Sequence, residues 1–231
     1  MILVILILVG LVGFYTYTKF FSYQEEQEYL DKVINNPNIQ LEEKREHFIL
    51  TNKKTKDYKE NIIFYPGGLV NPKAYLYKLS NLVGERNIRI FLIKAPFKAS
   101  IFDINAGRRI IDKYNLENVI IGGHSLGGIS ACRLIDNNSD KIIKLFLLGS
   151  YCDTDISDFK GEIISIIGQN DQIINKDNYN SSKINLPENT IFTEKEGLNH
   201  SGFGNYGLQK GDGELELQET DIINLIQETL D

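Results

Sequence analysis

Short apolar runs alternate along the chain with longer segments in which apolar residues recur at helical spacing. The runs lie at 47–51, 61–65, 87–93, 119–121, 142–148, 163–167 and 190–193. Their β-branched residues, and the glycine, proline or polar residues that bound them, are typical of buried strands. Helices are expected at 72–83, in the segment that ends near 114, from 126 onward and at 215–230, with a polar helix or loop at 173–185. This alternation predicts an α/β fold, a doubly wound, mostly parallel sheet with helices on both faces.

An uncharged apolar segment precedes these elements. Residues 1–18 are mostly Ile, Leu and Val, and as a helix they would span about 27 Å, close to the thickness of a bilayer's hydrocarbon core. The aromatic residues near its end are typical of an interfacial belt: Tyr15, Tyr17, Phe20 and Phe21. A cleaved signal peptide is the alternative, but the segment has neither a basic n-region nor a small-x-small cleavage site. We therefore predict an N-terminal transmembrane helix and a single-pass protein of the cell membrane.

The chain divides into three parts on this interpretation. Residues 1–21 are the predicted transmembrane anchor, the acidic and polar residues 22–46 are predicted to form a stalk or an entry segment to the domain, and residues 47–231 form the predicted domain without a lid. Only Lys19 and Lys32 bear on the orientation in the membrane, and we expect the domain on the extracytoplasmic side.

Residues 118–131 predict a strand, a sharp turn and a helix around one serine. The turn has the G-x-S-x-G sequence Gly123-His-Ser-Leu-Gly127, whose glycines let strand and helix approach without a clash. Ser125 would stand exposed above the sheet. The amide of Leu126, at the start of the helix, would point toward negative charge developing on an attacked carbonyl. A G-x-S-x-G sequence also occurs by chance, but the apolar segments on either side fit a nucleophilic serine.

A serine hydroxyl is a weak nucleophile and needs a neighbouring base, and the chain has three histidines. His124 adjoins the serine, where its side chain should diverge from the hydroxyl, and His47 precedes the whole core. His200 lies in a glycine-rich loop after the last predicted strand, where it can overhang the carboxyl edge of the sheet. His200 is therefore the predicted base, and a surface-loop histidine is the alternative interpretation.

The carboxylate that orients the base should lie between serine and histidine in the sequence. Asp171 follows the predicted strand 163–167 and is the best candidate, because a loop there would place it beside His200. Asp153 and Asp155, one strand earlier, are the alternatives. A turn-forming or helix-capping role is the other interpretation of Asp171.

Composition limits the classes of function. The 231 residues carry a net charge of −6 with dispersed basic residues, so no nucleic-acid partner is expected. Cys132 and Cys152 have neither metal-ligand spacing nor a disulfide framework pattern, and they do not report the redox compartment. No metal or organic cofactor is implied, and the sequence leaves the oligomeric state open.

Four motifs resemble, in the same order, those of the α/β-hydrolase family, specifically the small bacterial group related to dienelactone-hydrolase-like enzymes. They lie at 66–70, 122–128, 168–171 and 199–207 with 210–213, within a resemblance that runs from residue 62 to the C-terminus. By this resemblance Ser125, Asp171 and His200 are the nucleophile, the acid and the base.

The same resemblance implies an oxyanion hole formed by the amide of Leu126 and one near Gly68 or Leu69. The sequence has Pro-Gly-Gly where many relatives have His-Gly, which leaves open which of these two amides donates. Residues 149–162, where many relatives insert a lid, are too few to form one. A shallow, open site is therefore expected.

These residues predict a membrane-anchored serine hydrolase that cleaves an ester, thioester or similar acyl bond of a small molecule through an acyl-enzyme intermediate. An acyltransferase that uses the same triad is the alternative. A non-catalytic, membrane-tethered binding module would not need the serine, the acid and the histidine together, which disfavours that interpretation.

Overall fold

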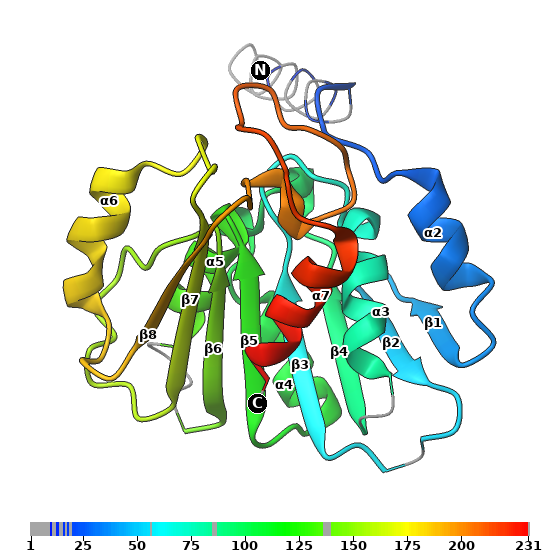
Figure 1. Cartoon of the computed structure of the whole chain (residues 1–231). Coiled ribbons are helices and arrows are strands. Elements are labelled where there is room, and N and C mark those ends of the chain that lie inside the picture. The colour runs from blue at the N-terminus through cyan, green and yellow to red at the C-terminus, as the bar shows by residue number, and fades with distance from the viewer. Residues whose placement is uncertain are drawn as a thin grey trace, which may run out of the picture.

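The computed structural model describes residues 10, 13, 16, 18, 20–55, 57–84, 87–135 and 140–230. These residues form an eight-stranded sheet with the order β1-β2-β4-β3-β5-β6-β7-β8 (Figure 1). The strands are β1 (Ile39–Glu43), β2 (His47–Asn52), β3 (Glu60–Tyr65), β4 (Ile88–Ile93), β5 (Val119–His124), β6 (Ile142–Leu148), β7 (Glu162–Gly168) and β8 (Ile191–Lys195). β1 and β2 pair antiparallel with their neighbours, whereas β3 to β8 are parallel. The prediction of a mostly parallel sheet is confirmed.

Helices cover both faces of this sheet. They are α2 (Gln27–Ile34), α3 (Leu76–Val83), α4 (Ala106–Tyr114), α5 (Leu126–Ile135), α6 (Lys176–Ser181) and α7 (Glu219–Glu228), with short 3-10 helices at Pro72–Tyr75, Pro96–Lys98, Ser100–Phe102, Ser182–Asn185 and Ser201–Phe203. α2, α3 and α7 share one buried core with Ile62 and Phe64 of β3, and α4 and α5 share the other with Ile63 and Tyr65. Because side chains alternate along a strand, β3 contributes to both cores. Figure 1 shows the two helical layers.

The segment 22–46, predicted to be a stalk or an entry segment, contains two elements of the folded domain. α2 packs against α3, and β1 pairs with β2, with Ile39 opposite Asn52. Only Ile39 of β1 is buried. An edge strand has a neighbour on one side alone and needs few apolar residues, so the sequence pattern did not reveal this one.

The predicted anchor, residues 1–21, falls mostly outside the described residues. Among the residues that the structure does describe, no helix combines the length and apolar character needed to cross a membrane. The chain joins the domain at Tyr23, which forms an isolated parallel bridge with Val70.

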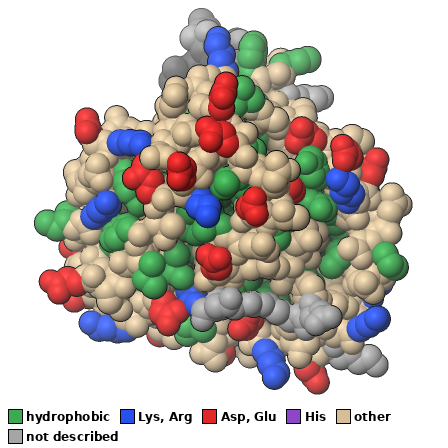
Figure 2. Space-filling view, in the orientation of Figure 1, with side chains coloured by type: hydrophobic (Ala, Val, Ile, Leu, Met, Phe, Trp, Pro, Cys, Tyr) green, Lys and Arg blue, Asp and Glu red, His purple; other side chains and the backbone are tan. Residues whose placement is uncertain are grey.

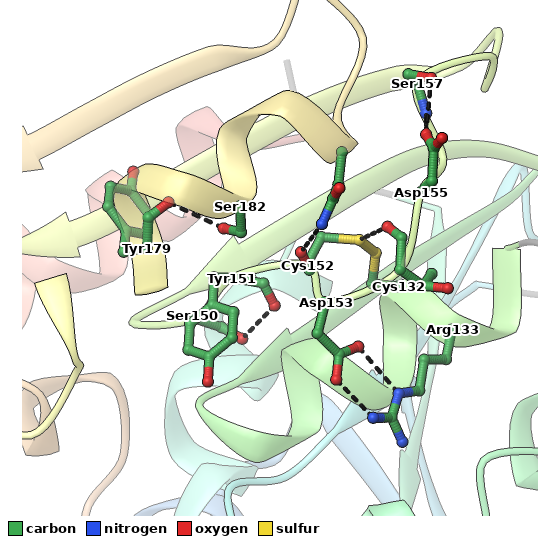
Figure 3. The surroundings of a disulfide bond; sticks show 12 residues. Cys132, Arg133, Ser150, Tyr151, Cys152, Asp153, Asp155, Ser157, Tyr179 and Ser182 are labelled. Carbon is green, nitrogen blue, oxygen red and sulfur yellow. Dashed lines mark hydrogen bonds and ion pairs between the residues drawn. A yellow bond between two sulfur atoms is a disulfide. The ribbon is translucent and has the colours of Figure 1, made fainter. Parts of the chain in front are cut away.

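A disulfide joins Cys132 in α5 to Cys152 in the loop after β6, with Cα atoms 5.7 Å apart (Figure 3). The two cysteines have no disulfide framework pattern in the sequence. The two cysteines come together only because α5 packs beside the carboxyl end of β6, which spacing alone does not reveal. Closing a loop of this length stabilises the fold by about 3 kcal/mol in the chain-entropy estimate.

Charged side chains are interspersed over the face in Figure 2, with acidic and basic groups side by side. Several form exposed ion pairs, such as Lys32 with Glu28 and Lys176 with Glu194. This distribution agrees with the dispersed charges of the sequence.

Candidate active site

Ser125 occupies a strained turn between β5, which ends at His124, and α5, which begins at Leu126. Its φ is 53°, a left-handed conformation that is uncommon for residues other than glycine. The turn also requires glycine at two neighbouring positions. A Cβ on Gly123 would lie 2.4 Å from the backbone of Gly127, and one on Gly127 would lie 2.1 Å from the carbonyl oxygen of Tyr65. These glycines let strand and helix cross closely enough to present the serine at the carboxyl edge of the sheet.

Asp171 and His200 form a buried pair in the loops after β7 and β8. Asp171 Oδ2 lies 2.7 Å from His200 Nδ1. A carboxylate can only accept, so Nδ1 donates and Nε2 is left free to accept a proton. The other carboxylate oxygen, Oδ1, accepts from the amides of Ile173 and Ile174, each at 2.9 Å. Both side chains are almost fully buried, which fixes the orientation of the imidazole.

The pair adjoins the turn that holds Ser125. A Cβ on Gly149, the residue after β6, would lie 3.1 Å from His200 Nδ1. Leu148 accepts from the Ser125 amide at 3.0 Å, and Ser150 Oγ donates to the Ser125 carbonyl at 2.6 Å. Within the described residues no hydrogen bond joins Ser125 Oγ to His200, and catalytic hydrogen bonds are often long before substrate binds. The loops at the carboxyl ends of β6, β7 and β8 thus place the Asp171–His200 pair beside the turn that holds Ser125.

A chain of buried hydrogen bonds passes through His124, whose role the sequence analysis missed. His124 Nε2 lies 3.1 Å from the carbonyl oxygen of His200, and Nδ1 lies 2.8 Å from the Tyr75 hydroxyl. Because a carbonyl only accepts, Nε2 donates and Nδ1 accepts from Tyr75. Tyr75 in turn accepts from the amide of Gly67 at 3.0 Å. The chain therefore links three loops: the one after β3, the serine turn and the histidine loop.

Burial keeps both members of this chain uncharged. Desolvation, together with the nearby His200, lowers the pKa of His124 well below its usual value. Desolvation likewise raises the pKa of the Tyr75 hydroxyl. Neutral groups with fixed donor directions suit a positioning role rather than proton transfer.

Gly68 is the better of the two predicted oxyanion donors on the β3 loop. The amide of Leu69 donates to the carbonyl of Lys98 at 2.7 Å and is therefore occupied. The amide of Gly67 is occupied by Tyr75. Among the described residues, no acceptor is recorded for the amide of Gly68 or of Leu126, and a Cβ on Gly68 would lie 3.0 Å from Leu126 Cδ2. Gly68 and Leu126 therefore lie side by side, whereas the Leu69 amide already has a partner.

The alternative acids have other partners. Asp153 forms a two-pronged ion pair with Arg133, at 3.0 and 2.5 Å (Figure 3). Asp155 accepts from the amide and hydroxyl of Ser157. Only Asp171, of the three candidates, pairs with a histidine.

Asp212 is a second residue that the sequence analysis did not single out for a role. Its Oδ1 accepts from the His200 amide at 3.2 Å, and its Oδ2 accepts from the amide and hydroxyl of Ser201, at 2.8 and 2.9 Å. It also accepts from the Gln172 amide at 3.4 Å, beside Asp171. Asp212 therefore ties the histidine loop to the acid loop. The only signal in the sequence was its glycine-flanked position in 210–213.

The connection between β6 and β7, which borders the site, is short and contains no regular element. Residues 149–161, between β6 and β7, form no helix or strand. Across the described residues, no group of three or more His, Cys, Asp or Glu side chains is arranged to hold a metal ion.

We expect Tyr75→Phe to lower kcat roughly tenfold with little change in KM. The substitution leaves the Gly67 amide and His124 Nδ1 without hydrogen-bond partners, and this loosens the loops that carry the serine and the histidine. Steady-state kinetics on a soluble ester measure this. Tyr77→Phe, which removes a hydroxyl two residues later in α3 that takes no part in these hydrogen bonds, is the matched control and should leave kcat unchanged. Equal effects of the two substitutions would exclude the positioning role.

Comparison with known proteins identifies the family and the fold. A sequence model of the alpha/beta hydrolase family matches residues 61–223. No curated protein sequence matches the chain significantly. Similar solved structures include a carboxylesterase from Bacillus subtilis (TM-score 0.62, 9% identity, 95% of this chain and 97% of that one) and an esterase from Pseudomonas putida (0.61, 12%, 88% and 85%). Mouse alpha/beta hydrolase domain-containing protein 10 is also similar (0.58, 13%, 84% and 96%). At such identities the likeness shows the fold alone.

Proposed function

We propose that this hydrolase, which belongs to the alpha/beta hydrolase family, cleaves a carboxylic ester, thioester or related acyl bond with Ser125 as nucleophile. The observation that carries the proposal is the buried Asp171–His200 hydrogen bond of 2.7 Å, held beside a serine in a strained turn. A histidine with one nitrogen bound to a carboxylate and the other free is the arrangement that activates a serine hydroxyl. Within the family, we propose the group related to dienelactone-hydrolase-like enzymes, on the four motifs of the sequence.

The proposed reaction has two halves. Ser125 Oγ attacks the acyl carbonyl while His200 Nε2 takes its proton, and the oxyanion accepts hydrogen bonds from the amides of Gly68 and Leu126. The tetrahedral intermediate collapses, the proton passes from His200 to the leaving oxygen or sulfur, and the acyl group remains on Ser125. Water then attacks this acyl-enzyme by the same steps in reverse order. Asp171 holds the tautomer of His200 and stabilises its protonated form.

Pre-steady-state hydrolysis of p-nitrophenyl esters tests this proposal. We expect a burst of p-nitrophenol followed by a slower steady rate, because the acyl-enzyme forms before it is hydrolysed. Ser125→Ala should abolish both phases and leave the fold intact, since the change removes one hydroxyl from a half-buried turn position. Turnover that survives in Ser125→Ala would overturn the assignment of the nucleophile.

We further propose that residues 1–21 anchor the enzyme in the cell membrane with the catalytic domain on the extracytoplasmic side. The uncharged apolar run of the sequence supports the anchor. The Cys132–Cys152 disulfide supports the side, because disulfides persist in oxidising compartments. The test is sedimentation with membranes after carbonate washing, followed by protease accessibility in intact cells. Recovery of a shortened, soluble protein would show instead that the segment is a cleaved signal.

A further inference from the structure

The residues that follow the apolar run are hydrogen-bonded into the loop after β3. The Tyr23 amide donates to the carbonyl of Leu69, and the Asn71 amide donates to the carbonyl of Tyr23, each at 2.8 Å. Leu69 directly follows Gly68, the proposed oxyanion donor. The residues 22–26, which we call the stem, therefore join the domain at the loop that borders the active site.

The stem is also bound to the histidine loop. The Lys210 amide donates to the Tyr23 hydroxyl at 3.0 Å, and the Glu26 amide donates to the carbonyl of Asn205 at 2.9 Å. The rings of Tyr23 and Tyr206 have centroids 5.6 Å apart. Figure 1 shows the blue N-terminal segment over the carboxyl ends of the strands, beside the orange loop that follows His200. The stem is thus fixed to two loops that flank Ser125.

These contacts limit the distance between the carboxyl edge of the sheet, where Ser125 lies, and the membrane in which the chain is proposed to be anchored. Tyr23 lies five positions after residue 18, and an extended chain over that interval reaches at most about 18 Å. A tether this short, attached to two loops, restricts rotation as well as distance.

Apolar groups are present at the same edge. Phe20 is 76% exposed, and Leu208, on the histidine loop, is 65% exposed. A cavity of about 600 Å³ opens between the start of the stem and the loop after β4, lined by Phe20 and Ser22 on one side and by Ala95, Phe97 and Lys98 on the other. Exposed Phe and Leu side chains at one edge suit insertion at the boundary between headgroups and acyl chains of a bilayer. Lys98 Nζ donates to Ser22 Oγ, which ties the loop after β4 to the stem as well.

We propose that the carboxyl edge of the sheet faces the bilayer surface and that the substrate is an ester with a long acyl chain, presented from the membrane. The proposal rests on the proposed function and on its anchor. A long acyl chain partitions into the bilayer, and a tethered site that faces the surface meets it at high effective concentration. A water-soluble ester would gain nothing from this geometry.

The orientation can be measured with single tryptophans, because the chain has no native Trp. In phosphatidylcholine vesicles that contain brominated lipids, the fluorescence of Leu208→Trp should be strongly quenched. The matched control is Ile143→Trp, which is 44% exposed but lies at the amino end of β6, on the opposite edge. Its fluorescence should not be quenched. Equal quenching at the two positions, or none at Leu208→Trp, would overturn the proposed orientation, as would failure of the full chain to bind vesicles.

The substrate class is tested with the full chain in the same vesicles. Hydrolysis rates are measured for two esters: 1-oleoylglycerol dispersed in the bilayer and soluble p-nitrophenyl acetate. Each rate is compared between the native chain and a variant with twenty Gly and Ser residues inserted between Phe21 and Ser22. Such a linker has a mean span of roughly 25 Å and frees the domain to rotate. Hydrolysis of the membrane ester should fall roughly fivefold or more, and that of the soluble ester should not change. Equal rates of the native chain and the linker variant on the membrane ester would overturn this inference. If the native chain hydrolysed neither ester, the proposed function itself would be wrong.

Discussion

Asp171→Asn is expected to lower kcat for ester hydrolysis by about 10⁴-fold and to leave KM nearly unchanged. The reason lies in the two backbone amides, of Ile173 and Ile174, that donate to Asp171 Oδ1. In the variant, these two backbone amides would hold the only remaining acceptor, the oxygen of the Asn side chain, in the position of Oδ1. The NH₂ group would then face His200 Nδ1, which must accept instead of donate. This places the proton on Nε2, where it blocks the acceptance of the serine proton.

Asp153→Asn is the matched control for this prediction. It changes the same functional group in the loop after β6, where the partner is Arg133 rather than a histidine. The ion pair is partly exposed, so its loss should hardly affect kcat or stability. A mild Asp171→Asn and a severe Asp153→Asn, measured by kcat under the same conditions, would move the acid one strand earlier and contradict the geometry described here.

Of the substitutions described here, Gly127→Ala should cause the largest loss of stability, about 3 kcal/mol or more in the free energy of unfolding. A Cβ there would lie 2.1 Å from the carbonyl oxygen of Tyr65 and 2.5 Å from that of Pro66. Both are backbone atoms, so no side chain can move aside, and α5 must separate from the end of β3. For a chain of this size the melting temperature should fall by about 10 °C. Activity should fall as well, because Pro66 leads into the loop that contains Gly68.

Thermal unfolding followed by circular dichroism measures this loss. Arg133→Ala, on the same helix, removes only a partly exposed ion pair and should cost less than about 1 kcal/mol. A melting temperature for Gly127→Ala equal to that of the native protein would show that the strand and helix are not in the close contact described for the serine turn.

The elements that hold the site could be predicted because each carries a local signal. β5 and α5 are apolar segments whose adjoining ends carry the glycines of the G-x-S-x-G turn, and the strands before Asp171 and His200 are short apolar runs. Parallel strands end at a common edge, so residues that follow them meet there. The prediction of Asp171 and His200 as partners combined this rule with the order of serine, acid and histidine along the chain and with the elimination of the other two histidines.

The remaining features depend on contacts between distant segments. The Cys132–Cys152 disulfide needs α5 beside β6, and the chain through Tyr75 and His124 needs three loops in register. The choice of Gly68 over Leu69 depends on a single carbonyl, that of Lys98, from the loop after β4. None of these partners has a fixed spacing in the sequence.

β1 escaped prediction for a different reason. It is an edge strand with one buried residue, Ile39, and its polar composition gives a weak strand signal. Its partner β2 is almost entirely buried and was predicted.

Reaction with a fluorophosphonate probe, followed by mass-spectrometric mapping of the adduct, tests whether Ser125 is the nucleophile. One adduct, on Ser125, is expected in the folded protein. No adduct is expected in Ser125→Ala, and labelling should be much slower in His200→Gln, because the serine would lose its base. An adduct on another residue, or undiminished labelling of Ser125→Ala, would rule out Ser125 as the nucleophile.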